Sequence, residues 1–130
     1  MIAVDSSSWI AYLAGGRGSD VEAIALALEH RQAVLPPVVL TELLSDPALT
    51  ADVKTLLGSL PMLEVLAGYW ERAGVLRARL LAQGRKARLA DTLITQSCLD
   101  HDVELVTRDR DFITLARAGG VRLFGARSRP

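Results

Sequence analysis

Short apolar runs alternate with longer amphipathic segments along the chain. The short runs have the length and bounding residues of buried strands, and the predicted strands cover residues 2–4, 33–35, 62–66, 104–107 and 121–124. The longer segments repeat apolar residues at helical spacing and carry capping or stop signals at their ends. The first predicted helix starts at the serine triplet after residue 5, and the others cover residues 19–30, 38–45, 46–57, 69–83, 89–100 and 111–118.

This order of elements predicts an α/β fold. Strands separated by helices favour a mostly parallel sheet that is covered on both faces and joined by right-handed crossovers. The chain of 130 residues has no internal repeat or linker, so we expect a single domain over residues 1–130. Asp5 interrupts the first apolar run, which excludes a signal-peptide core or a membrane span there. We therefore expect a soluble protein of the cytoplasm.

The composition predicts a core of aliphatic residues. Half of the chain is hydrophobic and only 5% is aromatic, so Leu, Val, Ile and Ala must fill most of the interior. Cys98 is the single cysteine, which excludes an internal disulfide and a cysteine-based zinc cluster and fits a reducing compartment. We expect Cys98 to be a small buried hydrophobic residue.

Charge is unevenly distributed although the net charge is zero. Residues 1–66 carry three basic and eight acidic side chains, whereas residues 67–130 carry twelve basic and seven acidic ones. The segment 72–88 contains six basic residues and no acidic one. It could face phosphates or an acidic partner segment, or it could be an ordinary solvated surface.

Acidic residues follow the predicted strands at one edge of the sheet. Asp5 directly follows the first strand, and Asp109 lies two residues past the fourth. Glu42 lies on the helix that begins after the second strand, and Asp91 lies in the first turn of the helix from residue 89. Ligands of open parallel sheets bind beyond the carboxyl ends of the strands. If the first and fourth strands are neighbours, Asp5 and Asp109 share one crevice.

Each acid taken alone also has a structural explanation, because aspartate is common in first helical turns and after strands. Apolar neighbours, however, predict partial burial of Glu42 and Asp91. Buried, clustered carboxylates need protons, arginines or a cation. Oxygen ligands favour Mg²⁺ or Mn²⁺, and zinc is disfavoured because His30 and His101 lie at predicted helix ends. Such a metal ion can orient a phosphodiester and activate water.

Four segments resemble the acidic motifs of PIN domains in order and spacing: residues 4–10, 41–43, 90–95 and 105–112. The resemblance covers nearly the whole chain and is greatest to the VapC-type toxins of bacterial VapBC modules. It implies a three-layer α/β/α sandwich with a five-stranded parallel sheet and a homodimer. It also implies a VapB-type antitoxin as partner, whose tail enters the acidic crevice and blocks it.

The same resemblance implies roles for individual residues. Asp5, Glu42, Asp91 and Asp109 would be the catalytic, metal-binding acids. Thr107 or Ser6 would help to hold the first aspartate or a metal-bound water. For Asp111 a capping or supporting role is favoured over direct ligation, and Phe112 is expected to pack beneath the last motif.

The resemblance further implies a Mg²⁺-dependent endoribonuclease that cuts structured RNA such as transfer or ribosomal RNA, acting as a toxin. The candidates for RNA phosphate contacts are Arg85, Lys86, Arg88, Arg108 and Arg110. Trp9 and Trp70 could stack on a base, but a core or interface position is the favoured interpretation.

Two alternatives belong to other functional classes. A phosphoacceptor receiver domain has a similar fold and an acidic Mg²⁺ site, but it needs an aspartate after the third strand and a lysine after the fifth. Here Ala67 and Gly68 follow the third predicted strand, and the lysines lie only at 54 and 86. The second alternative is a PIN-like module that binds RNA or protein without catalysis, which the intact set of four acids disfavours.

Overall fold

A parallel sheet of three strands forms the centre of the computed structural model, which describes residues 1–125. The order β2-β1-β3 places β1 (Ile2–Val4) between β2 (Ala33–Val34) and β3 (Glu104–Val106). The register pairs Ala3 with Val34 on one side and with Leu105 on the other. The predicted neighbour relation between the first and fourth strand segments is therefore confirmed, and the last five residues of the predicted domain lie outside the described part.

The predicted five-stranded sheet is not confirmed within residues 1–125. The two outer segments are reduced to single parallel bridges, Leu35 with Met62 and Leu105 with Leu123. The Leu35 N–H donates to the Pro61 carbonyl at 2.9 Å, and the Leu63 N–H donates to the Leu35 carbonyl at 3.0 Å. The next bonds of a parallel ladder would need N–H groups from Pro61 and Pro37, and proline has none.

At the other edge of the sheet, beside β3, the parallel pairing ends for a different reason. The Leu105 N–H donates to the Arg122 carbonyl and the Phe124 N–H donates to the Leu105 carbonyl, both at 2.9 Å. One ladder step earlier, the Val103 N–H already donates to the Cys98 carbonyl at 3.1 Å as α6 ends. Competition from this helix-ending bond ends the pairing on the side of Leu105 that leads back to α6.

Seven helices surround the sheet within the described residues: α1 Ser6–Leu13, α2 Ser19–Glu29, α3 Pro37–Leu44, α4 Ala51–Ser59, α5 Tyr69–Ala82, α6 Leu89–His101 and α7 Arg110–Gly119. The predicted helices match these closely except for α4, which was expected from Asp46. The Asp46 side chain instead accepts the Ala48 N–H in a turn, and Thr50 caps the helix by accepting the Val53 N–H. None of these helices is both long and apolar enough to cross a membrane.

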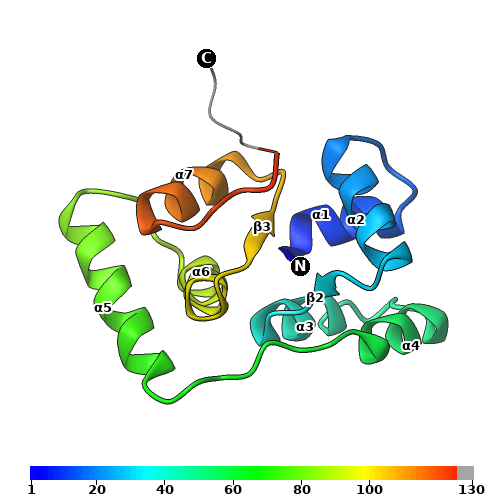
Figure 1. Cartoon of the computed structure of the whole chain (residues 1–130), viewed down its shortest axis with the longest axis horizontal. Helices are drawn as coiled ribbons and strands as arrows, with labels where there is room; N and C mark the ends of the chain where they lie inside the picture. Colours follow the sequence, from blue (N-terminus) through cyan, green and yellow to red (C-terminus); the bar gives the residue numbers. More distant parts are fainter. Residues whose placement is uncertain (126–130) are drawn as a thin grey trace.

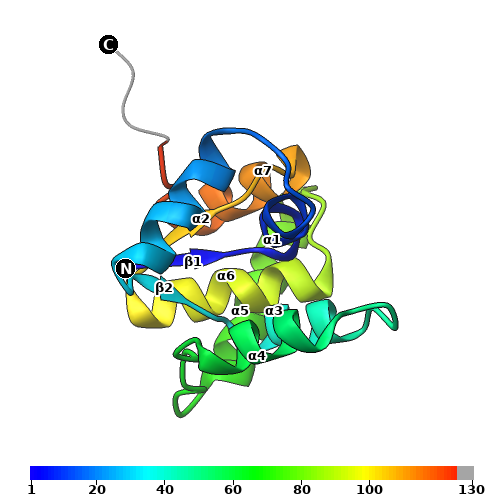
Figure 2. The same cartoon turned by 90° about the vertical axis from the view of Figure 1, so that its right-hand side faces the viewer.

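Helices cover both faces of the sheet, as predicted. In Figure 1, which looks nearly along the strands, α1 and α2 lie on one face and α6 lies on the other, with α5 outside it. Helices α3 and α7 each contact α6. Figure 2 shows that α1 begins where β1 ends and that α6 begins at this same end of the sheet. The carboxyl ends of the strands and these helix starts therefore share one rim of the molecule.

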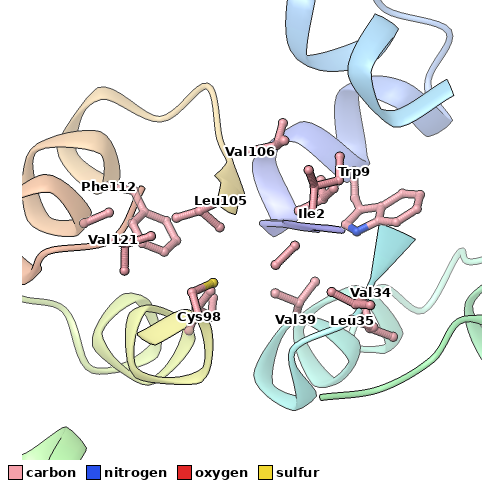
Figure 3. Packing of buried hydrophobic residues seen from close by; sticks show 14 of the residues in the cluster. Ile2, Trp9, Val34, Leu35, Val39, Cys98, Leu105, Val106, Phe112 and Val121 are labelled. Atoms are coloured by element: carbon pink, nitrogen blue, oxygen red, sulfur yellow. The ribbon is translucent and has the colours of Figure 1, made fainter. Parts of the chain in front are cut away.

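The core consists of two apolar layers (Figure 3). Ile2 and Val106 point to the α1 side, where Trp9 lies, while Leu105 points to the α6 side. Nearly all of the buried cluster is aliphatic, in agreement with the composition. Trp9 is fully buried, and the expectation of a buried Cys98 is confirmed.

Arg108 links the loop after β3 to the start of α2. Its guanidinium donates to both carboxylate oxygens of Asp20, at 2.8 and 3.0 Å, and to the Arg17 carbonyl at 2.8 Å. Asp20 also accepts the Ser8 hydroxyl at 2.8 Å. The hydrogen bond from Arg108 is the largest cause that lowers the pKa of Asp20 to about 2. This network fixes two loops that are far apart in the sequence.

Replacement of Phe112 by alanine should lower the free energy of unfolding by about 3–5 kcal/mol, because the ring is fully buried beside Leu105 and Val121. Urea denaturation followed by circular dichroism measures the change. The matched control is Phe124→Ala, because Phe124 is 43% exposed and its loss should cost less than about 1 kcal/mol. Equal losses for the two variants would contradict this packing.

The Asp20 network should make stability depend on pH. The folded-state pKa of about 2 lies below the ordinary value of 3.8, so the stabilisation is present above that ordinary value and is lost as the pH falls towards 2. Asp20→Asn should remove about 1 kcal/mol of this dependence. Thermal unfolding of both proteins between these pH values measures it, and parallel pH profiles would argue against the network.

Candidate functional site

Asp5 is a buried carboxylate at the end of the central strand. Its side chain is 4% exposed and caps α1 by accepting the Ser8 N–H at 3.2 Å. The Ser7 hydroxyl donates to it at 2.8 Å, and the Thr107 hydroxyl donates at 2.8 Å. Burial raises the pKa of Asp5 to about 6, although these hydrogen bonds act in the opposite direction. The local sequence thus holds a carboxylate where its charge is poorly solvated.

Thr107 joins the ends of β1 and β3. Besides donating to Asp5, its hydroxyl oxygen accepts the Asp109 N–H at 3.1 Å. Asp109 in turn caps α7, because its Oδ1 accepts the N–H groups of Asp111 at 2.9 Å and Phe112 at 3.3 Å. The hydrogen bond to Asp5 is the contact that the predicted supporting role of Thr107 requires, and the role itself remains a prediction.

Asp91 lies in the first turn of α6, as predicted, and is partly buried. Burial is the largest cause that raises its pKa, and the charges of Asp109 and Glu42 raise it further while Arg88 lowers it. The charge of Asp91 also raises the pKa of Asp5. Asp91 therefore interacts electrostatically with each of the other three acids. We call Asp5, Glu42, Asp91 and Asp109 the acidic cluster.

Glu42 is the exposed member of the acidic cluster, so the prediction of its partial burial is wrong. On α3, Val39 and Leu43 face the core, and a residue one position before Leu43 is turned away from that face. The Ser6 hydroxyl donates to the Glu42 carboxylate at 2.7 Å. Ser6 thus supports Glu42 rather than Asp5. The sequence interpretation missed Ser7, although the second residue after a capping aspartate is close enough to reach its carboxylate.

Two basic residues of the loop before α6 contact the acids. Arg88 pairs with Asp91 at 3.2 Å and with Asp109 at 3.2 Å, and it lies 4.0 Å from Asp111. The negative charges of these three acids raise the pKa of Arg88, and the charge of Asp91 has the largest effect. Lys86 pairs with Asp111 at 3.0 Å. Asp111 is exposed and does not cap α7, since Asp109 fills that position. Arg88 and Lys86 were predicted only as RNA contacts.

The remaining RNA candidates differ in their surroundings. The bonds to Asp20 and Arg17 account for Arg108 without any RNA. Arg85 donates to the Gln83 side chain at 3.2 Å, and Arg110 is exposed at the start of α7. Contact of any of these residues with RNA remains a prediction.

The two tryptophans considered for base stacking differ in their exposure. Trp9 is fully buried, so its predicted core position is confirmed and it cannot stack on a base. Trp70 is 62% exposed and packs edge-on against Tyr69 with ring centroids 4.8 Å apart. Trp70 is thus the one of the two tryptophans that a ligand or partner can reach. Phe112 is fully buried below the last motif, as expected.

The donor chemistry of the acidic cluster fits a hard divalent cation. All of its side-chain donors are carboxylate oxygens, and their mutual repulsion disfavours full ionisation unless a positive charge is near. Among residues 1–125, no three acidic, histidine or cysteine side chains form a ready metal-binding group. In this conformation the guanidinium of Arg88 is the positive charge that contacts Asp91 and Asp109. The two histidines lie at the C-terminal ends of helices, His30 at the cap of α2 and His101 in the last turn of α6.

Sequence comparison gives the family. Residues 2–118 match the model of the PIN domain. VapC ribonuclease Mb1587 of Mycobacterium bovis is 32% identical over 125 residues, an alignment that covers 90% of this chain and 92% of the relative. Ribonuclease VapC11 of Mycobacterium tuberculosis gives the same identity and coverage. These matches contradict the receiver-domain alternative.

Structure comparison agrees with this result. A DNA-bound VapBC structure from Salmonella typhimurium has a TM-score of 0.73 and 20% identity, covering 94% of this chain and 95% of that chain. VapBC2 from Rickettsia felis, bound to a fragment of its promoter DNA, has a TM-score of 0.70 and 20% identity, with coverage of 88% and 92%. At this identity the likeness shows the fold. The chain therefore belongs to the PIN domain family, as a member of its VapC group.

Proposed function

We propose that this protein is a metal-dependent endoribonuclease and the toxin of a VapBC-type toxin–antitoxin module. The observation that carries the proposal is the acidic cluster, in which a buried Asp5 and a partly buried Asp91 lie at one rim of the sheet and the charge of Asp91 raises the pKa of Asp5. The names of the relatives, which are VapC ribonucleases, support ribonucleolytic activity.

The acids have distinct tasks in this proposal. Asp5, Asp91 and Asp109 would hold Mg²⁺ or Mn²⁺, with Glu42 completing the site from its exposed position on α3. A bound divalent ion supplies charge neutralisation at a phosphodiester and a lower pKa for attacking water. Thr107 and Ser7 orient the Asp5 carboxylate through hydrogen bonds, and Ser6 restrains Glu42. Asp111 acts through its ion pairs with the basic loop and not as a ligand.

The substrate in this proposal is structured RNA such as transfer or ribosomal RNA. Exposed basic side chains lie next to the acidic cluster, in the loop before α6 and at the start of α7: Arg85, Lys86, Arg88 and Arg110. Cationic groups at these positions can fix the phosphates on either side of the cleaved bond. Arg108 contributes indirectly, because it holds the loop after β3 in place.

The proposed partners follow from the solved relatives. Both of those structures are described as VapBC bound to DNA. We propose a VapB-type antitoxin whose tail blocks the acidic cluster, a homodimer of this chain, and action in the cytoplasm. The combination of a toxic enzyme with a cognate inhibitor accounts for a small catalytic domain with an accessible site.

Hydrolysis of a mixed cellular RNA pool in Mg²⁺ or Mn²⁺ tests the activity. The parent protein should cleave, and Asp5→Asn or Asp91→Asn should lower the rate at least about a hundredfold, because each removes a carboxylate that the metal ion needs. A chelator should abolish cleavage, and added Mg²⁺ should restore it. Gel electrophoresis with end mapping measures the rates and cleavage sites.

The matched control is Asp52→Asn, which removes an exposed acid in the first turn of α4 away from the acidic cluster. It should cleave like the parent. Equal activity of the parent, Asp5→Asn and Asp91→Asn would reject the assignment of these acids. Binding of RNA without cleavage by the parent would favour the non-catalytic module instead.

Induced expression in a bacterial host should arrest growth, and co-expression of a cognate VapB-type antitoxin should relieve the arrest. Colony counts before and after induction measure both effects. Asp91→Asn should be harmless at equal protein level, because toxicity requires cleavage. Arrest by Asp91→Asn as severe as that by the parent would separate toxicity from RNA hydrolysis.

A further inference from the structure

Arg88 is placed between two members of the acidic cluster. Its Nε lies 3.2 Å from Asp91 Oδ2, and its Nη2 lies 3.2 Å from Asp109 Oδ2. The same Nη2 is 4.0 Å from Asp111 Oδ2. A planar guanidinium can bond to two carboxylates at once through different nitrogens. Arg88 thus joins the start of α6 to the start of α7 through two ion pairs, and the pair with Asp109 is also a hydrogen bond donated by Nη2.

The backbone of Arg88 is anchored while its side chain is not. The carbonyl of Arg88 accepts the N–H of Thr92 at 3.0 Å and the hydroxyl of Thr92 at 2.8 Å. The preceding residue, Ala87, is buried, and its carbonyl accepts Arg77 Nε at 2.8 Å. The Arg88 side chain is 51% exposed. It can therefore rotate into solvent about a fixed main chain.

The partner acids are also held without Arg88. Asp91 is fixed by its place in the first turn of α6, and Asp109 Oδ1 is occupied by the N–H groups that it caps. Arg88 contacts the other oxygen of Asp109, Oδ2. On Asp109, the oxygen that faces Arg88 is thus the one that capping leaves open to another cation.

We propose that Arg88 is an internal counter-ion of the acidic cluster, which pairs with Asp91 and Asp109 in the metal-free protein and must leave both when a divalent cation binds. The proposal rests on the proposed function, because it assumes that these acids hold the cation. Arg88 then makes the cluster stable without metal and lowers its affinity for metal. A purely structural arginine would do only the first.

The two roles predict changes of opposite sign. Without Arg88, two carboxylates lose their positive neighbour, so the metal-free protein should melt at a lower temperature. The same loss removes a competitor and a like charge near the cation, so metal should bind more tightly. Exposed ion pairs are weak, which sets the expected gain in affinity at about fivefold.

Isothermal titration of the RNA-free protein with Mn²⁺, together with its metal-free melting temperature, tests the proposal. Arg88→Met should lower the melting temperature and lower the Kd for Mn²⁺ by about fivefold. Arg88→Lys should restore part of both values, because an ammonium group is a point charge that cannot bridge the acids as a guanidinium does. The matched control is Arg117→Met, which removes an exposed arginine in the last turn of α7, away from the acidic cluster, and should change neither value.

A second measurement uses the parent protein alone and therefore does not depend on the folding of a variant. The NMR signal of Arg88 Nε should shift as Mg²⁺ saturates the protein, whereas that of Arg72 Nε, which pairs with Asp100, should stay in place. An unmoved Arg88 signal at saturation would overturn the proposal, as would an unchanged or higher Kd of Arg88→Met. Failure of the parent to bind either ion would overturn the proposed function itself, and the role of Arg88 with it.

Discussion

The structure depends on one constraint, the burial of a carboxylate at the end of the central strand. Asp5 ends β1, caps α1 and accepts the Thr107 hydroxyl from the loop after β3. Burial raises the pKa of Asp5 to about 6, so the fold holds a carboxylate whose charged form would be more stable in water. The strand order β2-β1-β3 brings the Asp109 segment to the same place. Asp5 therefore serves both the fold and the candidate site.

Much of this arrangement could be predicted from the sequence because it follows from local rules. Apolar runs and helix caps gave the strand and helix positions, and alternation of the two predicted a covered parallel sheet. The acids were found because strand ends and first helical turns point to one rim. The resemblance to PIN domains added the family, which residues 2–118 bear out.

The remainder depends on contacts that no local pattern determines. The strand predicted at residues 62–66 is reduced to a single bridge because Pro37 and Pro61 face the same ladder, and that register is visible only in three dimensions. Glu42 is exposed because its position around the axis of α3 differs from that of the buried Val39 and Leu43. Its apolar neighbours in the sequence had predicted partial burial instead. The long side chains of Lys86 and Arg88 can reach more than one acid. Which acids they pair with depends on how α6 packs against α7. These are effects of tertiary structure.

The single-residue bridges at both edges of the sheet have a consequence for self-association. An incoming chain extends a sheet only where several successive backbone groups are unpaired and lie in one line. On one edge, prolines remove donors beside Leu35, and on the other a helix-ending bond withdraws the Val103 N–H. Within residues 1–125, both features shorten the row of backbone groups that Leu35 and Leu105 can offer to an incoming strand. Assembly of this protein with another chain should proceed through side chains on helix surfaces.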